Sequence, residues 1–363
     1  MDTSILFKPM KMGSIEVNHR IALAPMSRRR ATSDHLPTPI MKEFYSQRAA
    51  VPGTLLFTDA NLVSAAAGGL LHMSGIWSAE QTALWKEIVD DVHSKGSFIY
   101  CQLVAVGRVA DEQSIKLDGI TRIGPSAIPL EGNPPPHVMS VDEIKQIVED
   151  FANAAKNAME AGFDGVEIDG NNGLLHDQFV QDVTNQRDDE YGGTIENRSR
   201  FAYDSVKAIA DAIGAERVGY RMSPWSTFWG MRMKDPVPQF TDVINKLKEI
   251  GIGHIHLIES RICGDQQVED PETLDFAYKA WDGPILINGG YTPDTARQLA
   301  EAHPDRDIMV TFGRSFIANP DLVYRAKHGV AFTHYDRPTF YTQGAKGYID
   351  YPFSENYLAS IQH

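Results

Sequence analysis

Two short segments in the last quarter of the chain have the composition of a phosphate site. Gly289-Gly290 and Gly313-Arg314 each follow an apolar run. Glycine lets backbone N–H groups approach an anion closely, and a guanidinium group can donate two parallel hydrogen bonds to a phosphate. Either segment alone could equally be an ordinary turn or a surface charge. The two together favour a phosphorylated ligand.

A third segment offers groups for acid–base or hydrogen-bonding chemistry. Asp169-Gly170-Asn171-Asn172 follows another apolar run and presents one carboxyl group and two amides. Gln102 and Arg221 stand at the ends of two further apolar runs. Because a buried strand needs neither glycine nor polar groups for its packing, these positions indicate a site built from the ends of several strands.

Other kinds of cofactor or metal site lack support in the sequence. No Gly-x-Gly-x-x-Gly segment follows the first apolar run, and no P-loop lysine motif occurs. No His-Glu-x-x-His motif or close Cys/His cluster is present, so we expect no metal. His254 and His256 alternate along one apolar run, and we interpret them as core residues. Cys101 is interpreted as a buried strand thiol.

Eight short, apolar, β-branched runs supply the elements that must position these groups. The predicted strands are Arg20–Ala24, Thr54–Asp59, Ser97–Val104, Phe163–Asp169, Arg217–Met222, Gly253–Glu259, Pro284–Asn288 and Asp307–Phe312. Amphipathic patterns predict helices between them, most clearly at Ser78–Ser94, Ser140–Ala161, Asn197–Ile213, Phe240–Ile250, Thr292–Ala300 and Pro320–Lys327. This alternation implies a parallel sheet, doubly wound or closed. The count of eight favours a closed (β/α)8 barrel, with the site at the C-terminal ends of the strands.

The length fits one barrel domain. A barrel of this kind needs about 250 residues, which leaves about 110 of the 363 for loops. The longest loop, Ala105–Met139, contains Asn133-Pro134-Pro135-Pro136 and is expected to be a lid or a binding loop. We therefore predict an α/β protein with a single TIM-barrel domain, residues 1–363, that carries loop insertions.

Composition restricts the partners. The formal net charge of −14 argues against nucleic acid and against anionic membrane surfaces. No stretch approaches the roughly 18 uninterrupted apolar residues of a membrane span. The two cysteines, Cys101 and Cys263, suit a reducing compartment. We expect a cytoplasmic protein, a monomer or homodimer, that acts on a small-molecule substrate.

Longer motifs carry a family resemblance that covers nearly the whole chain. The chain resembles the old yellow enzymes, which are FMN-dependent ene reductases. The resemblance is carried by Asn18-His19-Arg20-Ile21, Ala24-Pro25-Met26-Ser27, Gly75-Ile76-Trp77-Ser78-Ala79-Glu80-Gln81, Gly162-Phe163-Asp164-Gly165-Val166-Glu167-Ile168, Tyr191-Gly192-Gly193-Thr194-Ile195-Glu196-Asn197-Arg198, Phe312-Gly313-Arg314-Ser315-Phe316-Ile317-Ala318-Asn319-Pro320-Asp321-Leu322 and Thr339-Phe340-Tyr341.

The resemblance implies a barrel that holds noncovalent FMN, with NADPH as the hydride donor. The Gln102 amide would face the pyrimidine edge of the flavin, and the Arg221 cation would stabilise the negative charge of the reduced ring. The flavin contacts implied by the resemblance are Pro25, Ser27, Ala60, Gln102, Asn172, Arg221, Gly289, Gly290, Gly313 and Arg314.

Two further groups of side chains are expected near this site. Aromatic residues are expected close to the barrel mouth: Trp225, Phe228 and Trp229 in the loop after the fifth strand, and Phe340 and Tyr341 near the C-terminus. Of these, Trp225, Phe340 and Tyr341 are expected to contact the substrate. The alternative is that these aromatic residues only pack the loops against the barrel. Arg28-Arg29-Arg30 is expected to be a solvated run with one member near the edge of the flavin.

Two departures from the family pattern alter the expected chemistry. The family has a His-x-x-Asn or His-x-x-His pair that grips the substrate carbonyl oxygen, followed by Gly-Tyr, whose tyrosine protonates the alkene carbon. Here Asp169 replaces the first donor, Asn172 keeps the second, and Leu174 replaces the tyrosine. An ionised Asp169 about 4 Å from a developing oxyanion would cost roughly 4 kcal/mol at an effective dielectric of about 20.

Several roles for these residues stay open. Asp169 could be protonated in a dry pocket and donate, pair with a cationic substrate, or act as a base. Leu174 cannot donate a proton, so reduction would need a water, a loop tyrosine or another acid. His176 is a weak candidate, because residues i and i+2 of a helix point apart. Drift toward a weakened activity is a further alternative.

These observations lead to one main hypothesis and two alternatives. We predict an FMN-dependent oxidoreductase that acts on an activated C=C bond of a small specialised metabolite. Asp169, Asn172 and Leu174 form the predicted catalytic set, and Asp169, Asn172, Trp225, Phe340 and Tyr341 form the predicted substrate set. The first alternative is a desaturase, isomerase or cyclase that uses Asp169 as a base or cation anchor. The second is a non-catalytic flavin-binding protein.

Overall fold

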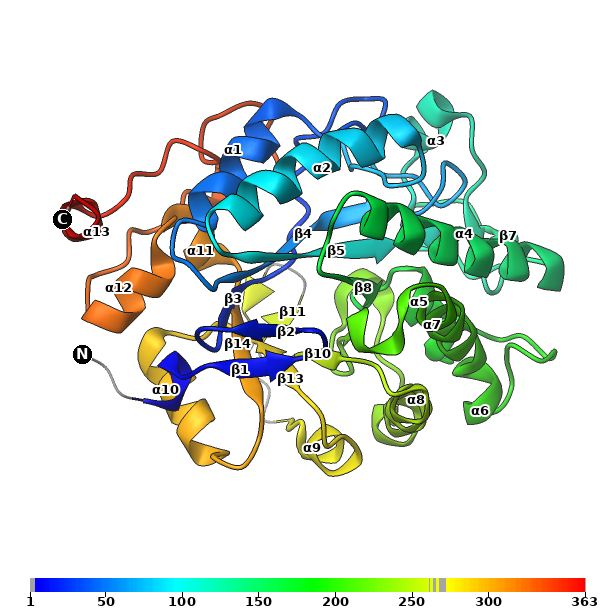
Figure 1. Ribbon diagram of the computed structural model, residues 1–363. Coiled ribbons are helices and arrows are strands. Elements are labelled where there is room, and N and C mark those ends of the chain that lie inside the picture. Colours follow the sequence, from blue (N-terminus) through cyan, green and yellow to red (C-terminus); the bar gives the residue numbers. More distant parts are fainter. Residues whose placement is uncertain (1–3, 261, 264–265, 268–271, 363) are drawn as a thin grey trace.

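Eight parallel strands close into a barrel in the computed structural model, which describes residues 4–260, 262–263, 266–267 and 272–362 (Figure 1). All eight predicted strands are confirmed, and so is the barrel. In the order of the closed sheet they are β10 (His254–Ile258), β13 (Ile285–Asn288), β14 (Ile308–Phe312), β3 (Ile21–Leu23), β4 (Leu55–Leu62), β5 (Phe98–Val104), β8 (Gly165–Gly170) and β9 (Val218–Met222).

Helices surround the barrel and connect its strands (Figure 1). The main ones are α1 (Pro39–Arg48), α2 (Ala79–Ser94), α4 (Val141–Glu160), α7 (Arg200–Ile213), α8 (Pro236–Ile250), α9 (Asp275–Ala280), α10 (Pro293–Ala302) and α12 (Leu322–His328). Capping boxes begin α2 at Ser78 and α4 at Ser140. Helix α8 begins at Pro236, earlier than the predicted Phe240, because the first turn of a helix needs no N–H donor.

Shorter elements complete the described chain. The helices are α3 (Glu112–Asp118), α5 (Leu175–Val180), α6 (Ile195–Arg198), α11 (Arg314–Ala318) and α13 (Glu355–Ser360). The strand pairs are β1 (Met10–Met12) with β2 (Ile15–Val17), β6 (Ile123–Gly124) with β7 (His137–Val138), and β11 (Ile262–Cys263) with β12 (Gln266–Gln267). Among the described helices, none combines the length and apolar composition that a bilayer crossing requires.

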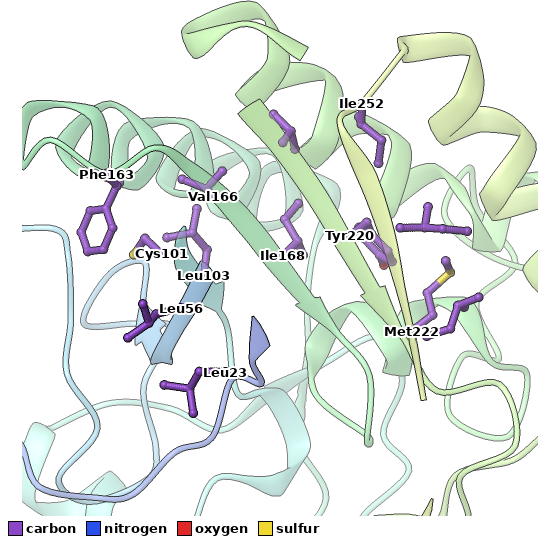
Figure 2. Close-up of a cluster of buried hydrophobic side chains, with 14 of the residues drawn as sticks. Leu23, Leu56, Cys101, Leu103, Phe163, Val166, Ile168, Tyr220, Met222 and Ile252 are labelled. Carbon is purple, nitrogen blue, oxygen red and sulfur yellow. The ribbon is translucent and has the colours of Figure 1, made fainter. Parts of the chain in front are cut away.

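The pleat of the barrel strands sorts apolar from polar side chains. On β5, β8 and β9, residues such as Cys101, Val166 and Tyr220 lie in the core cluster shown in Figure 2. Their neighbours Gln102 and Arg221 point to the other face, the barrel interior, because successive strand residues face opposite sides. The alternation therefore directs polar groups inward on several strands at once. It also confirms that Cys101 is a buried strand thiol.

The β1–β2 hairpin covers one end of the barrel. Met12 and Val17 of the hairpin join a buried cluster with Leu55, Leu286 and Met309, which lie near the starts of their strands. This buried cluster fills the end of the barrel at which the strands begin. The carboxyl-terminal ends of the strands are left to form a cavity.

The long insertion, 105–139, supports the cavity wall without lining it. Val106, Val109 and Ala110 join an apolar cluster with Leu70 and Leu174, two residues that do line the cavity. Helix α3 and the β6–β7 pair lie within this insertion. No described residue of the insertion lines the cavity, so the structure gives no support to the prediction of a lid or a binding loop.

Buried arginines anchor the C-terminal segment, which corrects one expectation. Arg28 and Arg30 are only 2% exposed, so the predicted solvated run is wrong for two of its three members. Arg30 donates to the backbone carbonyls of Phe340 and Thr339, each at 2.9 Å. Arg28 Nε donates to the Phe340 carbonyl at 3.0 Å. The guanidinium groups thus supply donors to carbonyls at the end of a short 3-10 helix (Arg337–Thr339) and directly after it.

We predict that Arg30→Ala lowers the free energy of unfolding by about 3 kcal/mol, because it leaves buried carbonyls without a donor. Urea denaturation measures the loss, and limited proteolysis should cut faster within residues 337–348. Arg200→Ala is the matched control, since the Arg200 Nε bond to the Glu190 carbonyl is exposed. Its effect should stay below about 0.5 kcal/mol. Equal stability of the two variants would contradict the anchoring role of Arg30.

Candidate active site

A cavity of about 570 Å³ lies at the carboxyl ends of the barrel strands. It gathers side chains that are far apart in the sequence, and the described chain brings nine of the ten predicted cofactor contacts to its wall: Pro25, Ser27, Ala60, Gln102, Asn172, Arg221, Gly290, Gly313 and Arg314. Gly289 is absent from the lining. A Cβ atom added to Gly289 would lie 2.9 Å from the Glu259 Cβ, so this glycine permits close packing behind the wall.

The floor of the cavity carries an amide and a buried cation. Gln102 and Arg221 are 2% and 7% exposed. The Arg221 Nε atom is buried without a hydrogen-bond partner among the described residues. Burial lowers the pKa of Arg221, while Asp169 and Glu167 oppose that shift. An unpaired buried guanidinium nitrogen is costly, so this arrangement indicates a ligand with an acceptor at that position.

Asp169 lies beside Arg221, because the two residues are register partners on β8 and β9. Burial raises the pKa of Asp169 to about 7, and the Arg221 cation opposes that rise. Asn171 donates a hydrogen bond from Nδ2 to Asp169 Oδ1. At neutral pH the carboxyl group therefore populates both its protonated and its ionised form. It can act as a donor as well as an acceptor.

Asn172 is held in one orientation by two serines. Its backbone has a φ of 50°, a left-handed conformation that asparagine tolerates. The Asn172 N–H donates to Ser223 Oγ at 2.8 Å, and Ser226 Oγ donates to Asn172 Oδ1 at 3.1 Å. With Oδ1 engaged, the NH₂ group is the end of the amide left for a ligand in the cavity. Ser223 and Ser226 are positioning residues that sequence reasoning missed.

The predicted phosphate loops also meet at the cavity. Gly290 follows β13 with a φ of 67°, and Gly313 and Arg314 follow β14. The Arg314 guanidinium lies 5.9 Å from the centre of the Tyr335 ring and forms no ion pair with a carboxylate in the described part of the chain. Two loops at the last two barrel strands, with glycines and a cation, match the usual phosphate position of this fold.

A family model described as the NADH:flavin oxidoreductase / NADH oxidase family matches residues 5–332. The chain belongs to this family. It is 47% identical over 363 residues to the chanoclavine-I aldehyde reductase fgaOx3 of Penicillium roqueforti, with 98% of each chain covered. It is also 47% identical over 365 residues to the NADP-dependent oxidoreductase lnbE of Aspergillus flavus, with 97% of each covered.

Solved structures agree with this assignment. The old yellow enzyme homologue from Zymomonas mobilis superposes with a TM-score of 0.88 at 35% identity, covering 96% of this chain and 99% of that one. A further group of relatives, 43–45% identical, carries the names probable inactive reductase or dehydrogenase. The protein is thus an FMN-dependent oxidoreductase of the old yellow enzyme type, with nicotinamide as the hydride source.

The cavity of this flavoprotein fits FMN by its own chemistry. The unpaired Arg221 Nε and the neighbouring Gln102 amide would hold the polar pyrimidine edge. Gly290, Gly313 and Arg314 would hold the phosphate. The assignment of each lining residue to a part of the flavin stays a prediction.

An apolar wall replaces the proton donor of the family pattern. Leu174 is 8% exposed and belongs to a cluster with Leu70, Met73 and the partly buried Trp229. These four residues line the cavity together. His176 lies outside the lining, stacked at 4.4 Å on the Phe201 ring, and burial lowers its pKa to about 3. Its position confirms that it points away from the reacting groups.

The loop after β9 brings two of its three expected aromatic residues to the cavity, but not the one expected to contact the substrate. Phe340 and Tyr341 line the cavity, but Trp225 does not. Trp225 packs edge-on against Phe276, with ring centres 6.1 Å apart. Trp229 and its neighbour Phe228 reach the cavity instead, because Trp229 adopts a left-handed conformation with a φ of 53°. Nothing in the residue types distinguishes the two tryptophans.

Other lining residues could have been found from periodicity. Thr311 is buried at the cavity wall one position before the end of β14, where the strand alternation directs it inward. Leu70, Met73 and Tyr335 lie on irregular segments and carry no such signal. No cluster of potential metal ligands occurs among the described residues.

We predict that Arg314→Gln weakens FMN binding by roughly 10- to 100-fold, because a charged hydrogen bond to phosphate is worth about 1.5–3 kcal/mol. The dissociation constant is measured by the fluorescence of released FMN, and the defect should shrink as salt increases. Arg200→Gln, on the surface of α7, is the control and should bind FMN normally. Unchanged affinity in Arg314→Gln would exclude this residue from the phosphate site.

Proposed function

We propose that the protein reduces a C=C bond conjugated to a carbonyl group in a small specialised metabolite, with NADPH as reductant. The observation that carries the proposal is a cavity where two potential donors, Asp169 and Asn172, face an apolar wall. The NADP-dependence in the name of the relative lnbE supports NADPH. A cytoplasmic location and a monomeric or homodimeric state belong to the same proposal.

Asp169 and Asn172 would bind the carbonyl oxygen of the substrate. The bound FMN supplies hydride transfer between the nicotinamide and the substrate. Negative charge then develops on the carbonyl oxygen, where hydrogen-bond donors stabilise it. Asn172 offers its NH₂ group, since Ser226 engages its Oδ1. Asp169 donates only when it is protonated. Burial raises its pKa to about 7, so the protonated form is present at neutral pH.

The apolar wall indicates a substrate with a hydrophobic body. Leu70, Met73, Leu174 and Trp229 offer no hydrogen bond to a polar ring or chain, apart from the indole N–H. The relative fgaOx3 is named as an aldehyde reductase. This name supports an unsaturated aldehyde as the substrate class of the present protein. Protonation of the second carbon would fall to Tyr335 or Tyr341, whose side chains line the cavity, or to water.

A second candidate function rests on the same carboxyl group. With a pKa of about 7, Asp169 is also ionised in part at neutral pH. In that form it could take a proton from a substrate carbon or anchor a cationic amine. Such a site would desaturate, isomerise or cyclise its substrate. The two functions require opposite protonation states, so they predict opposite pH profiles.

We predict that the reductase rate falls as pH rises above about 7, because only protonated Asp169 donates. Asp169→Asn keeps a donor and cannot titrate, so its rate should stay within about tenfold of the native rate and lose the decline. Steady-state kinetics with an unsaturated aldehyde at pH 5–9 measures both. Asp177→Asn is the matched control, since Asp177 is buried with a pKa near 7 but lies outside the cavity lining.

The opposite outcomes favour the second function. A rate that rises through pH 7 and disappears in Asp169→Asn would make Asp169 a base or a cation anchor. A bound flavin that NADPH fails to reduce under anaerobic conditions would reject the reductase.

We further predict that Asp169→His combined with Leu174→Tyr raises the reduction rate of a simple cyclic enone by about 100-fold or more. The two changes rebuild the donor set of the family, and a positioned general acid contributes about 10²–10⁴-fold. The control is Asp169→His with Leu174→Phe, which fills the same space without the hydroxyl group. Equal rates of the two variants, both loaded with FMN, would show that position 174 does not limit enone reduction.

A further inference from the structure

A buried carboxylate, Glu167, lies next to Gln102, a residue of the cavity wall. Glu167 is fully buried on β8 and has three polar contacts with side chains of β5 and β10. Gln102 Nε2 donates to Oε1 at 2.9 Å, and the nitrogens His254 Nε2 and His256 Nδ1 lie 3.2 and 2.9 Å from Oε2. The interpretation of both histidines as core residues is therefore confirmed, and both contact the carboxyl group of Glu167.

The protonation states follow from the donors. Burial alone would raise the pKa of Glu167, but the neighbouring His256 and the hydrogen bonds from both histidines lower it below its ordinary range. Burial lowers the pKa of His256 to about 4, against the opposing effect of Glu167. Glu167 is thus an anion, and His256 serves it as a neutral N–H donor.

Glu167 fixes the direction of the Gln102 amide. Gln102 Nε2 donates to Glu167, and the Gln102 backbone N–H donates to Thr58 Oγ1 at 2.9 Å. The Gln102 side chain lines the cavity, so its Oε1 atom is the acceptor end that faces a ligand. A glutamine without this partner could turn its amide over and present the wrong end.

A second arm of the same network reaches the cavity through Thr311. The His256 Nε2 atom lies 3.0 Å from Thr311 Oγ1, and Thr311 lines the cavity. With His256 Nδ1–H directed at Glu167, Nε2 is left to accept the threonine proton. Glu167 also acts on the third polar group of the floor, because its charge opposes the loss of the Arg221 charge.

We propose that Glu167, held by His254 and His256, is a positioning residue that orients Gln102 and Thr311 and balances Arg221, and thereby sets the affinity and reduction potential of the bound flavin. Three polar groups at the cavity floor depend on this one carboxylate. The proposal rests on the FMN site and concerns the binding and potential of the cofactor, independently of the substrate.

Two substitutions of Glu167 separate its charge from its shape. Glu167→Gln keeps the shape and removes the charge, so Arg221 stabilises the reduced, anionic flavin more strongly. The reduction potential should become more positive, with an altered visible spectrum. Glu167→Asp keeps the charge but withdraws the carboxylate from Gln102 Nε2. The FMN dissociation constant should then rise about tenfold or more, with a smaller change of potential.

The measurements use the FMN-loaded full-length protein, with potential by anaerobic dye equilibration and affinity by flavin fluorescence. Asp321→Asn is the control: Asp321 is also a fully buried carboxyl group, bonded to Arg325 at 2.8 Å, but lies outside the cavity lining. It should leave potential and spectrum unchanged. If Glu167→Gln does not fold, Glu167→Asp alone still tests the orientation of Gln102.

The proposal would be overturned if folded Glu167 variants kept the reduction potential, the visible spectrum and the FMN affinity of the wild-type protein. Native turnover with a changed potential would support it. A wild-type protein that binds FMN but reduces no unsaturated carbonyl would contradict the proposed function alone, and the potentials of the Glu167 variants would still be decisive for this inference.

Discussion

Charge buried inside the barrel must be compensated within the barrel, and this constraint shapes the whole site. An isolated buried ion costs several kcal/mol, so Glu167, Asp169 and Arg221 each need opposite charge or hydrogen-bond partners nearby. Two histidines and an amide contact Glu167, and Asp169 lies in register with Arg221. These residues lie on β5, β8, β9 and β10, which are successive neighbours in the closed sheet, so the pairing of these strands brings each charge next to the groups that compensate it. Fold and site are therefore built by the same pairing.

The cavity wall depends on a second set of buried cations. Arg28, Arg30 and Arg48 donate to carbonyls of the C-terminal segment, and that segment carries Phe340 and Tyr341 to the cavity. Without these donors, buried carbonyls of this segment would be left unsatisfied. Arginine suits this role because its fork of donors can serve two carbonyls at once. Residues from the start of the chain thus hold this part of the cavity wall in place.

The strand pattern and the motifs could be predicted from the sequence because both depend on local order. Short apolar, β-branched runs predict all eight barrel strands, and the motif positions converge on one cavity. Loop conformation could not be predicted in this way. Trp225 and Trp229 have the same type and nearly the same position, and only the left-handed backbone at Trp229 decides which one reaches the cavity. The burial of Arg28 and Arg30 could not be predicted from the sequence either, because the carbonyls that accept their hydrogen bonds lie more than 300 residues away along the chain.

The two departures from the family pattern belong together in physical terms. Replacing tyrosine with Leu174 makes the cavity wall more apolar, and a drier wall favours the neutral form of a nearby carboxyl group. Replacing histidine with Asp169 places such a carboxyl group beside Arg221, which favours the charged form. The opposing effects leave its pKa near 7, close to the value of the histidine that it replaces. The site has therefore exchanged one group that titrates near neutral pH for another, with the opposite charge. A histidine gains positive charge as the pH falls, whereas Asp169 loses negative charge. In the proposed reductase, protonated Asp169 would therefore present a neutral donor to the substrate oxygen, where a protonated histidine would present a cation.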